Sequence, residues 1–296
     1  MTPSPPPDLA PPFELIEPAA RRSPVVLNSP HSGARYPEPF VRASRLDPLT
    51  LRRSEDAFVD ELFLPAVLLG APMLRAHFPR AWLDVNREPY ELDPRMFEDR
   101  LPPFVNTRSL RVAGGLGTIA RIVGDSHEIY RGRLPVAEAL ERIERVYKPY
   151  HACLYGALAE TQMRFGVALL LDCHSMPSTG NVRGERFRAD VVLGDRYGTS
   201  CAPEISLMVE RALTQAGYTV ARNRPYAGGY ITEHYGSPSS GIHALQIEVN
   251  RGLYMDEQRH VKSAGFDRLQ ADLCRAVSRL VEFPFHDLIA PRAAAE

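Results

Sequence analysis

The run VALLLDCHS, residues 167–175, constrains the fold of this chain more than any other feature. It follows Gly166, and its nearly unbroken apolar residues are typical of a strand that is buried on both faces of a sheet. Such a strand needs a covering layer on each side, and helices supply these layers in α/β proteins. We therefore expect a central strand here, in a layered α/β fold.

Strand-like and helix-like patterns alternate along the rest of the chain. Strands are predicted at 24–33, 71–78, 81–87, 189–195 and 243–255, and helices at 54–70, 135–165, 201–217 and 257–281. The first of these helices has Ser54 as an N-cap and Gly70 at its end. This alternation indicates an α/β fold with a mostly parallel or mixed central sheet, flanked by helices.

The expected domain organisation is simple. Residues 1–23 are rich in proline, which disfavours regular structure, so we expect an N-terminal arm. Residues 24–296 contain no repeat and no linker-like boundary, and we expect them to form a single α/β domain. Within it, residues 89–132 form a long irregular insertion, and insertions of that length are usually functional or disordered.

The charge balance disfavours a polyanion-binding protein. Lys+Arg 35 against Asp+Glu 36 gives a formal net charge of -1, so no basic field favours nucleic acid or a membrane surface. Any acidic substrate must therefore be bound by local arginines. We expect a small-molecule partner, and the sequence leaves the oligomeric state open.

The cysteines and the termini indicate a cytoplasmic protein. The sequence has Cys 4 and no CxxC pair, which disfavours a structural zinc knuckle or a redox dithiol. No secretory signal precedes the first strand, and no apolar run approaches the ~20 residues of a membrane span. We expect free thiols and no association with membranes.

Polar side chains follow several of the predicted strands. His31 comes after the first strand, Asp172 and His174 close the central one, and Glu248 lies in the last one. A carboxylate inside an apolar strand is costly unless it has a partner. Because ligands collect at the carboxyl ends of strands in α/β sheets, we expect these side chains to meet.

Two of these histidines suggest a metal site. Catalytic zinc takes three protein ligands and leaves a fourth position to water. His31 and His174 are the natural nitrogen ligands, and we choose Asp56 as the third, with Glu55 and Asp60 as alternatives. Without an HExxH pair, the site must be assembled from distant segments.

Glu248 completes this reading as the general base. A carboxylate that is not a ligand can take a proton from the attacking water, with its pKa tuned by burial and by the metal. We therefore expect one Zn²⁺ per chain and hydrolytic chemistry.

Five blocks carry a resemblance to a known family: SPHSGARYP, EDAFVDELF, FPRAWLDVNR, LLLDCHSMPS and YAGGYITEHYGSPSSGIHALQIEVNRGLYMD. Together they resemble the N-formylglutamate amidohydrolases over nearly all of residues 24–282. The resemblance implies a phosphorylase/hydrolase-like α/β sandwich, similar to zinc carboxypeptidases and aspartoacylases. It also implies a zinc-dependent hydrolysis of N-formyl-L-glutamate to formate and glutamate, a terminal step of histidine breakdown. His31, His174 and Glu248 match the family's motif positions.

Arginines near one strand are candidates for binding substrate carboxylates. Planar guanidinium groups recognise carboxylates through two parallel hydrogen bonds. Arg80 and Arg87 flank the predicted strand 81–87, and Asn86 with Arg87 resembles the carboxylate-binding Asn-Arg pair of zinc carboxypeptidases. The alternative for Arg87 is a salt bridge to Asp84 or Glu88.

Two later segments offer further substrate contacts. Arg183, Arg186 and Arg188 follow the His174 turn and supply a second anchor, unless the loop is merely solvated. Tyr230 and Thr232, beside two glycines, suit a lid or an oxyanion contact, with an ordinary surface loop as the alternative.

The leading interpretation is a zinc amidohydrolase that acts on an N-formyl or N-acyl acidic amino acid. A carboxypeptidase-like or deacylase-like hydrolase of another N-acyl metabolite or peptide is the first alternative. A non-catalytic small-molecule binder that retains the fold is the second. Glu248 disfavours the binder, because a binder has no use for a base beside the metal.

Overall fold

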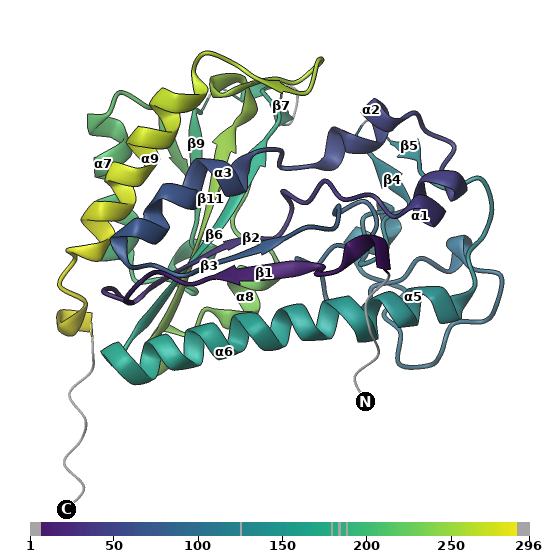
Figure 1. The fold of residues 1–296 in the computed structure, drawn as a ribbon, viewed down its shortest axis with the longest axis horizontal. Helices are drawn as coiled ribbons and strands as arrows, with labels where there is room; N and C mark the ends of the chain where they lie inside the picture. The colour runs from purple at the N-terminus through teal and green to yellow at the C-terminus, as the bar shows by residue number, and fades with distance from the viewer. Residues whose placement is uncertain (1–6, 125, 179, 183–184, 188, 289–296) are drawn as a thin grey trace, which may run out of the picture. The chain divides into compact units, whose positions relative to one another are not determined.

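A mixed sheet forms the centre of the protein. The structure, a computed structural model, describes residues 7–124, 126–178, 180–182, 185–187 and 189–288. Among these residues, the main sheet has the strand order β1-β3-β2-β6-β11-β9-β10 (Figure 1). The bounds are β1 Phe13–Ile16, β2 Val25–Ser29, β3 Met73–Ala76, β6 Ala168–Met176, β9 Val191–Gly194, β10 Val220–Arg222 and β11 Ile242–Asn250. Strand β6 is parallel to β2 and β11, whereas β11 is antiparallel to β9, as expected for a mixed sheet.

Helices flank the sheet, which confirms the predicted fold class. The helices among the described residues are α1 Glu38–Ala43, α2 Pro48–Leu51, α3 Val59–Phe63, α4 Leu110–Ala113, α5 Val136–Arg142, α6 Lys148–Phe165, α7 Pro203–Gln215, α8 Tyr230–Tyr235 and α9 Phe266–Val281. Of these, α3, α7 and α8 contact strands of the main sheet. Helix α9 packs against α7 and α3, and α8 packs against β11 and β6 (Figure 1). The small hairpins are β4 Ile122–Val123 with β5 His127–Glu128, β7 Gly180–Val182 with β8 Glu185–Phe187, and β12 Met255–Asp256 with β13 Val261–Lys262.

By its internal contacts the chain divides into two compact units. Unit 1 comprises Met1–Leu15, Ser29–Phe58 and Leu74–Leu154, and unit 2 comprises Ile16–Asn28, Val59–Met73 and Tyr155–Glu296. The single domain over 24–296 stays a prediction. None of the described helices is both long and apolar enough to cross a membrane.

The central strand β6 is buried along its whole length, as its sequence predicts. Leu169, Leu170 and Leu171 are each 0% exposed. Fully burying a leucine side chain contributes roughly 1.5–3 kcal/mol, so this strand is a large part of the core. The four cysteines of the chain are free thiols, as expected.

The observed helix ends agree only in part with those predicted from the sequence. Gly70 ends the segment that starts with α3, and its φ of 93° is the left-handed conformation that glycine adopts most easily. Ser54 is not the N-cap, because α3 begins only at Val59. The last helix begins at Phe266 rather than at 257, since the chain first forms β12 and β13.

The predicted strand at 81–87 is wrong. Trp82 N donates to Pro79 O at 2.9 Å and Asp84 N donates to Thr118 O at 2.8 Å, so the segment turns instead of pairing with a strand. Residues 81–86 are nevertheless buried. Burial in a turn, rather than sheet pairing, therefore explains their apolar character.

The proline-rich stretch contains more regular structure than its composition predicts. Strand β1, Phe13–Ile16, is the edge strand of the main sheet, next to β3. Leu9 is 0% exposed, and the Phe13 ring meets the Tyr150 ring edge-on with centroids 5.4 Å apart. Apolar packing thus orders the chain between the prolines.

Candidate functional site

His31 lies in a tight turn directly after β2. The side chain is 1% exposed, and its backbone oxygen accepts a hydrogen bond from Asp56 N at 3.0 Å. The hydroxyl oxygens of Ser29 and Ser32 lie 2.5 Å apart across the same turn. The turn is therefore fixed on both sides of the imidazole.

Gly33 makes this turn possible. A Cβ at this position would lie 2.1 Å from the Phe78 backbone oxygen, which real structures do not tolerate. We expect Gly33→Ala to lower the free energy of unfolding by about 1–3 kcal/mol, as overpacking usually does. Urea unfolding followed by circular dichroism measures this loss.

Gly156→Ala is the matched control, because a Cβ there meets nothing within 4 Å and the residue lies inside α6. Alanine is favoured over glycine in a helix by about 0.8–1.0 kcal/mol, so this variant should be slightly more stable. Equal effects of the two substitutions would show that the contact with Phe78 does not matter.

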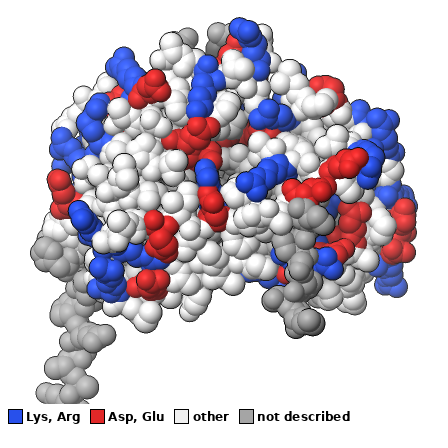
Figure 2. All heavy atoms as spheres, viewed as in Figure 1, with Lys and Arg blue, Asp and Glu red and all other residues white. Residues whose placement is uncertain are grey.

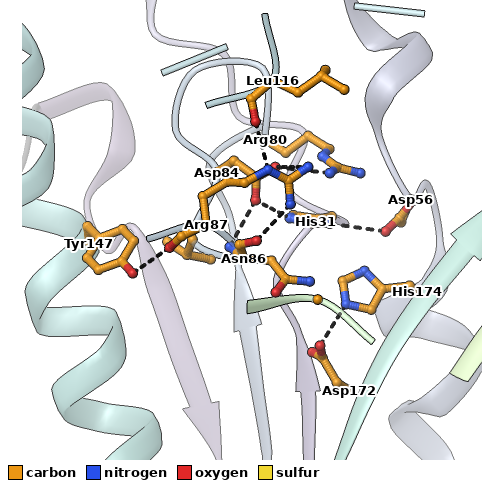
Figure 3. A network of polar contacts seen from close by, with 12 residues as sticks. His31, Asp56, Arg80, Asp84, Asn86, Arg87, Leu116, Tyr147, Asp172 and His174 are labelled. Atoms are coloured by element: carbon orange, nitrogen blue, oxygen red, sulfur yellow. Dashed lines mark hydrogen bonds and ion pairs between the residues drawn. The ribbon is translucent and has the colours of Figure 1, made fainter. Parts of the chain in front are cut away.

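Two carboxylates lie beside the His31 ring. Nε2 lies 2.7 Å from Asp84 Oδ1, and Nδ1 lies 3.3 Å from Asp56 Oδ2 (Figure 3). All three side chains are buried, at 5% exposure or less. The shorter contact favours a proton on Nε2, which makes Nδ1 the nitrogen with the lone pair.

Asp84 is shared between His31 and two arginines. Its Oδ2 lies 2.9 Å from Arg80 and 3.4 Å from Arg87. Burial raises the pKa of Asp84, but the charges of Arg87 and Arg80 and the hydrogen bond with His31 outweigh this effect and hold the pKa well below its usual range. Asp84 is therefore ionised at neutral pH.

The long insertion positions Arg87. The guanidinium Nε donates to Leu116 O at 2.7 Å, and the Tyr147 hydroxyl donates to Arg87 O at 2.7 Å. Burial, followed by the nearby positive charges of Arg80 and Arg111, lowers the pKa of Arg87 to about 10, so it stays charged at neutral pH. The predicted salt-bridge alternative is present, since Asp84 is its partner.

In unit 2, His174 is held by the carboxylate two residues before it. His174 Nε2 lies 2.9 Å from Asp172 Oδ2, and Asn28 donates to Asp172 Oδ1 at 2.8 Å. Figure 3 shows the His174 ring directed toward Asp172. Unlike the contact of His31 with Asp84, this one is an ion-pair distance without hydrogen-bond geometry, because Asp172 Oδ2 accepts no hydrogen bond from the described residues.

Glu248 lies beside His174 on the neighbouring strand. The two residues are in register in the parallel pair β6 and β11, so their side chains share one face of the sheet. Glu248 is 8% exposed, and Gln246 Nε2 donates to its Oε1 at 2.8 Å. Gln246 in turn accepts from Gly229 N at 2.7 Å.

His31, Asp56 and His174 are a buried group of side chains that could hold a metal ion, within the part of the chain that the structure describes. Strand register explains the grouping. Asn28, three residues before His31, is in register with Asp172, two residues before His174. Parallel pairing therefore brings both histidines to the same end of the sheet.

The two alternative acidic ligands are engaged differently. Glu55 Oε1 accepts from the Tyr36 hydroxyl at 2.6 Å and from Arg52 Nε at 3.0 Å. Asp60 lies in the first turn of α3 and is outside the group that could hold a metal. Of the three candidate carboxylates, Asp56 belongs to the group that could hold a metal, and its role as a ligand stays a prediction.

The predicted substrate contacts are spread over several segments. Thr232 is 0% exposed and its hydroxyl lies 3.5 Å from Gln246 Oε1, so it supports the residue that holds Glu248. The Tyr230 ring stacks on His234 with centroids 5.0 Å apart. Arg183 lies outside the described residues. The substrate-binding roles of all three stay predictions.

One supporting residue, Gln246, was not selected from the sequence, and the contacts of Asp172 and Asp84 with the two histidines were not predicted. Asp172 and Gln246 each lie two positions before a selected residue, which is the spacing of side chains on one face of a strand. That signal was present in the sequence. The contact of Asp84 with His31 gave none, because the two residues are 53 positions apart in the chain.

The chain is similar to known proteins of one family. The N-formylglutamate amidohydrolase family matches residues 23–255. N-formylglutamate deformylase of Pseudomonas aeruginosa is 32% identical over 272 residues, which cover 91% of this chain and 94% of that protein. The N-formylglutamate deformylase of Pseudomonas putida is 28% identical over 239 residues, 80% of this chain and 83% of that one.

A solved structure is similar as well. The crystal structure of N-formylglutamate amidohydrolase from Ralstonia eutropha JMP134 has a TM-score of 0.86 and 39% sequence identity, and the match covers 92% of this chain and 97% of that one. The mixed sheet, with histidines and carboxylates at the ends of its strands, defines an α/β protein with a candidate metal centre. Within that class, this chain belongs to the N-formylglutamate amidohydrolase family.

Proposed function

We propose that this protein is a zinc-dependent amidohydrolase that cleaves N-formyl-L-glutamate to formate and L-glutamate. One observation carries the proposal: two strand-end histidines each keep Nε2 against a buried carboxylate, at 2.7 Å for His31 and 2.9 Å for His174. The names of the relatives support the substrate. The place in histidine breakdown rests on the resemblance alone, and the proposed cytoplasmic location rests on the cysteine pattern of the sequence.

The donor set fits zinc. Histidines that bind zinc usually donate their other ring N–H to a carboxylate, and Asp84 is within hydrogen-bond distance of His31 for that purpose, while Asp172 lies 2.9 Å from His174. His31, Asp56 and His174 would then hold the ion through two nitrogens and one oxygen. Bound there, zinc would polarise the formyl carbonyl and lower the pKa of a water molecule.

Glu248 moves the proton in this proposal. Gln246 fixes one of its carboxylate oxygens at 2.8 Å, which restricts the orientation of the group. Glu248 takes a proton from the attacking water and passes it to the amide nitrogen as the C–N bond breaks. The hydroxyl of the water ends in formate, and the proton ends on the amine of glutamate.

Arg80 and Arg87 bind the substrate carboxylates in this proposal, with Asn86 beside them. Asp84 positions both guanidinium groups, at 2.9 Å from Arg80 and 3.4 Å from Arg87. N-formyl-L-glutamate brings two carboxylates that such groups can bind. Arginine suits this task because its planar fork binds carboxylates through two parallel hydrogen bonds.

The proposal is tested by formate release from N-formyl-L-glutamate. We expect zinc-loaded protein to release formate and chelator-treated protein to do so only after zinc is added back. N-formyl-L-aspartate, N-acetyl-L-glutamate and N-formyl-L-methionine, assayed in parallel by amine release, test the chain length, the acyl group and the need for a side-chain carboxylate.

The possible outcomes separate the parts of the proposal. Preference for N-acetyl-L-glutamate would keep the hydrolase and change the acyl group. No turnover of any of the four compounds, by protein shown to hold one zinc, would remove the proposed reaction.

A further inference from the structure

A cavity in unit 1 is lined by arginines. Its volume is about 230 Å³. We call this cavity the arginine pocket. The charged residues that line it belong to unit 1: Arg45, Arg95, Arg121, Glu128, Arg131 and Arg133. None of them belongs to the proposed catalytic machinery.

The charge of the arginine pocket is strongly unbalanced. Five arginines face only Glu128 in its lining, and Asp93 behind it accepts from Arg95 and Arg121. Five positive charges against these two carboxylates leave a local formal charge of +3. The whole chain carries -1, and Figure 2 shows basic and acidic side chains interspersed over the face in view.

Backbone hydrogen bonds hold the segments of the pocket together. Arg45 N donates to Ile129 O at 2.8 Å, and Ile129 N donates to Arg121 O at 2.9 Å. Arg131 N donates to Ala43 O at 3.0 Å. The arginines therefore project from segments that are cross-linked to one another, so little order has to be gained when a ligand binds.

Several guanidinium groups are also fixed individually. Arg121 donates from Nε to Asp93 at 2.9 Å and from Nη1 to Glu128 at 3.2 Å, and Arg131 Nε donates to Ser44 O at 2.9 Å. Arg133 is exposed, and no hydrogen bond or ion pair joins it to another residue that the structure describes. It therefore supplies a positive charge that no carboxylate of the pocket neutralises.

We propose that the arginine pocket binds a compact oxyanion with two or more phosphate or carboxylate groups. Guanidinium forks favour such groups because they form paired, charge-assisted hydrogen bonds. The volume of about 230 Å³ lies below the roughly 300–1,000 Å³ of sites for drug-sized ligands, which limits the anion to a small one. The excess charge favours a multivalent anion over a monovalent one.

Isothermal titration calorimetry of the zinc-loaded protein tests this proposal. Inorganic pyrophosphate and tricarballylate represent the phosphate and carboxylate forms, and acetate is the monovalent comparison. We expect saturable binding of at least one multivalent anion, weaker at high salt. The metal content is measured after each titration, so that removal of zinc is not counted as binding.

Arg133→Glu should weaken that binding by about tenfold or more, because it replaces an attractive charge by a repulsive one. Arg259→Glu makes the same change in net charge at an exposed position of unit 2 and should leave binding unchanged. Arg131→Ala, which removes a lining guanidinium, should also weaken binding. Circular dichroism checks the fold of each variant.

Two results would overturn the proposal: no saturable binding of either multivalent anion, or equal affinity in the native protein, Arg133→Glu and Arg131→Ala. The ratio of the two affinities assigns the ligand to the phosphate or the carboxylate form. Formate release is not part of this test, so its outcome is independent of the proposed function.

Discussion

Replacing Glu248 by glutamine is expected to lower kcat for formate release by about 10²–10⁴ while the protein keeps its metal. Glutamine has nearly the same shape and can still accept the hydrogen bond from Gln246, which is 2.8 Å long. It cannot take a proton from water. Steady-state kinetics on N-formyl-L-glutamate, with zinc content measured on the same samples, gives both quantities.

Glu141→Gln is a suitable control, because Glu141 is an exposed residue of α5 and its ion pair with Arg145 is a surface pair. That variant should keep full activity, since surface pairs contribute little to stability. Full activity in Glu248→Gln would remove Glu248 from the mechanism and leave the family assignment untouched.

Replacing His174 by alanine is expected to abolish zinc binding and formate release together. The substitution removes a nitrogen ligand and leaves at most His31 and Asp56 for the metal. Removal of an outer carboxylate partner lowers metal affinity by roughly 10–100-fold, and the loss of affinity in His174→Ala should be larger. Zinc titration against a competing chelator measures the affinity, independently of turnover.

Two further variants, Asp172→Asn and His127→Ala, serve as comparisons for the zinc affinity of His174→Ala. Asp172→Asn keeps the imidazole but weakens the contact of 2.9 Å to His174, so affinity should fall by about 10–100-fold. His127 is an exposed residue of β5, and its loss should change nothing. Native zinc affinity in His174→Ala would place the metal elsewhere.

The sequence could locate His31, His174 and Glu248 because local patterns mark the strands that carry them. A buried apolar run or an alternating run fixes where a strand ends, and polar side chains at those ends stand out. The contacts of Asp84 with His31 and of Gln246 with Glu248 were missed for different reasons. Gln246 follows from the two-residue period of a strand, whereas Asp84 reaches His31 only through the folding of a distant segment.

Local sequence patterns also failed to predict some elements of the fold. Residues 81–87 look like a strand because they are apolar, yet they form a buried turn whose hydrogen bonds go to Pro79 and Thr118. Strand β1 arises in a proline-rich stretch because Phe13–Ile16 contains no proline itself and Phe13 packs against Tyr150. Tertiary context overrides composition in both places.

The sequence by itself determined the α/β class, the central strand β6 and the three side chains proposed for the chemistry. Those features depend on residues close together in the chain, where periodicity and burial leave a direct trace. Only the tertiary structure decided that Asp56 groups with His31 and His174, and that arginines from separate segments line the arginine pocket. Such groupings depend on strand register and on long-range hydrogen bonds, which local sequence patterns do not encode.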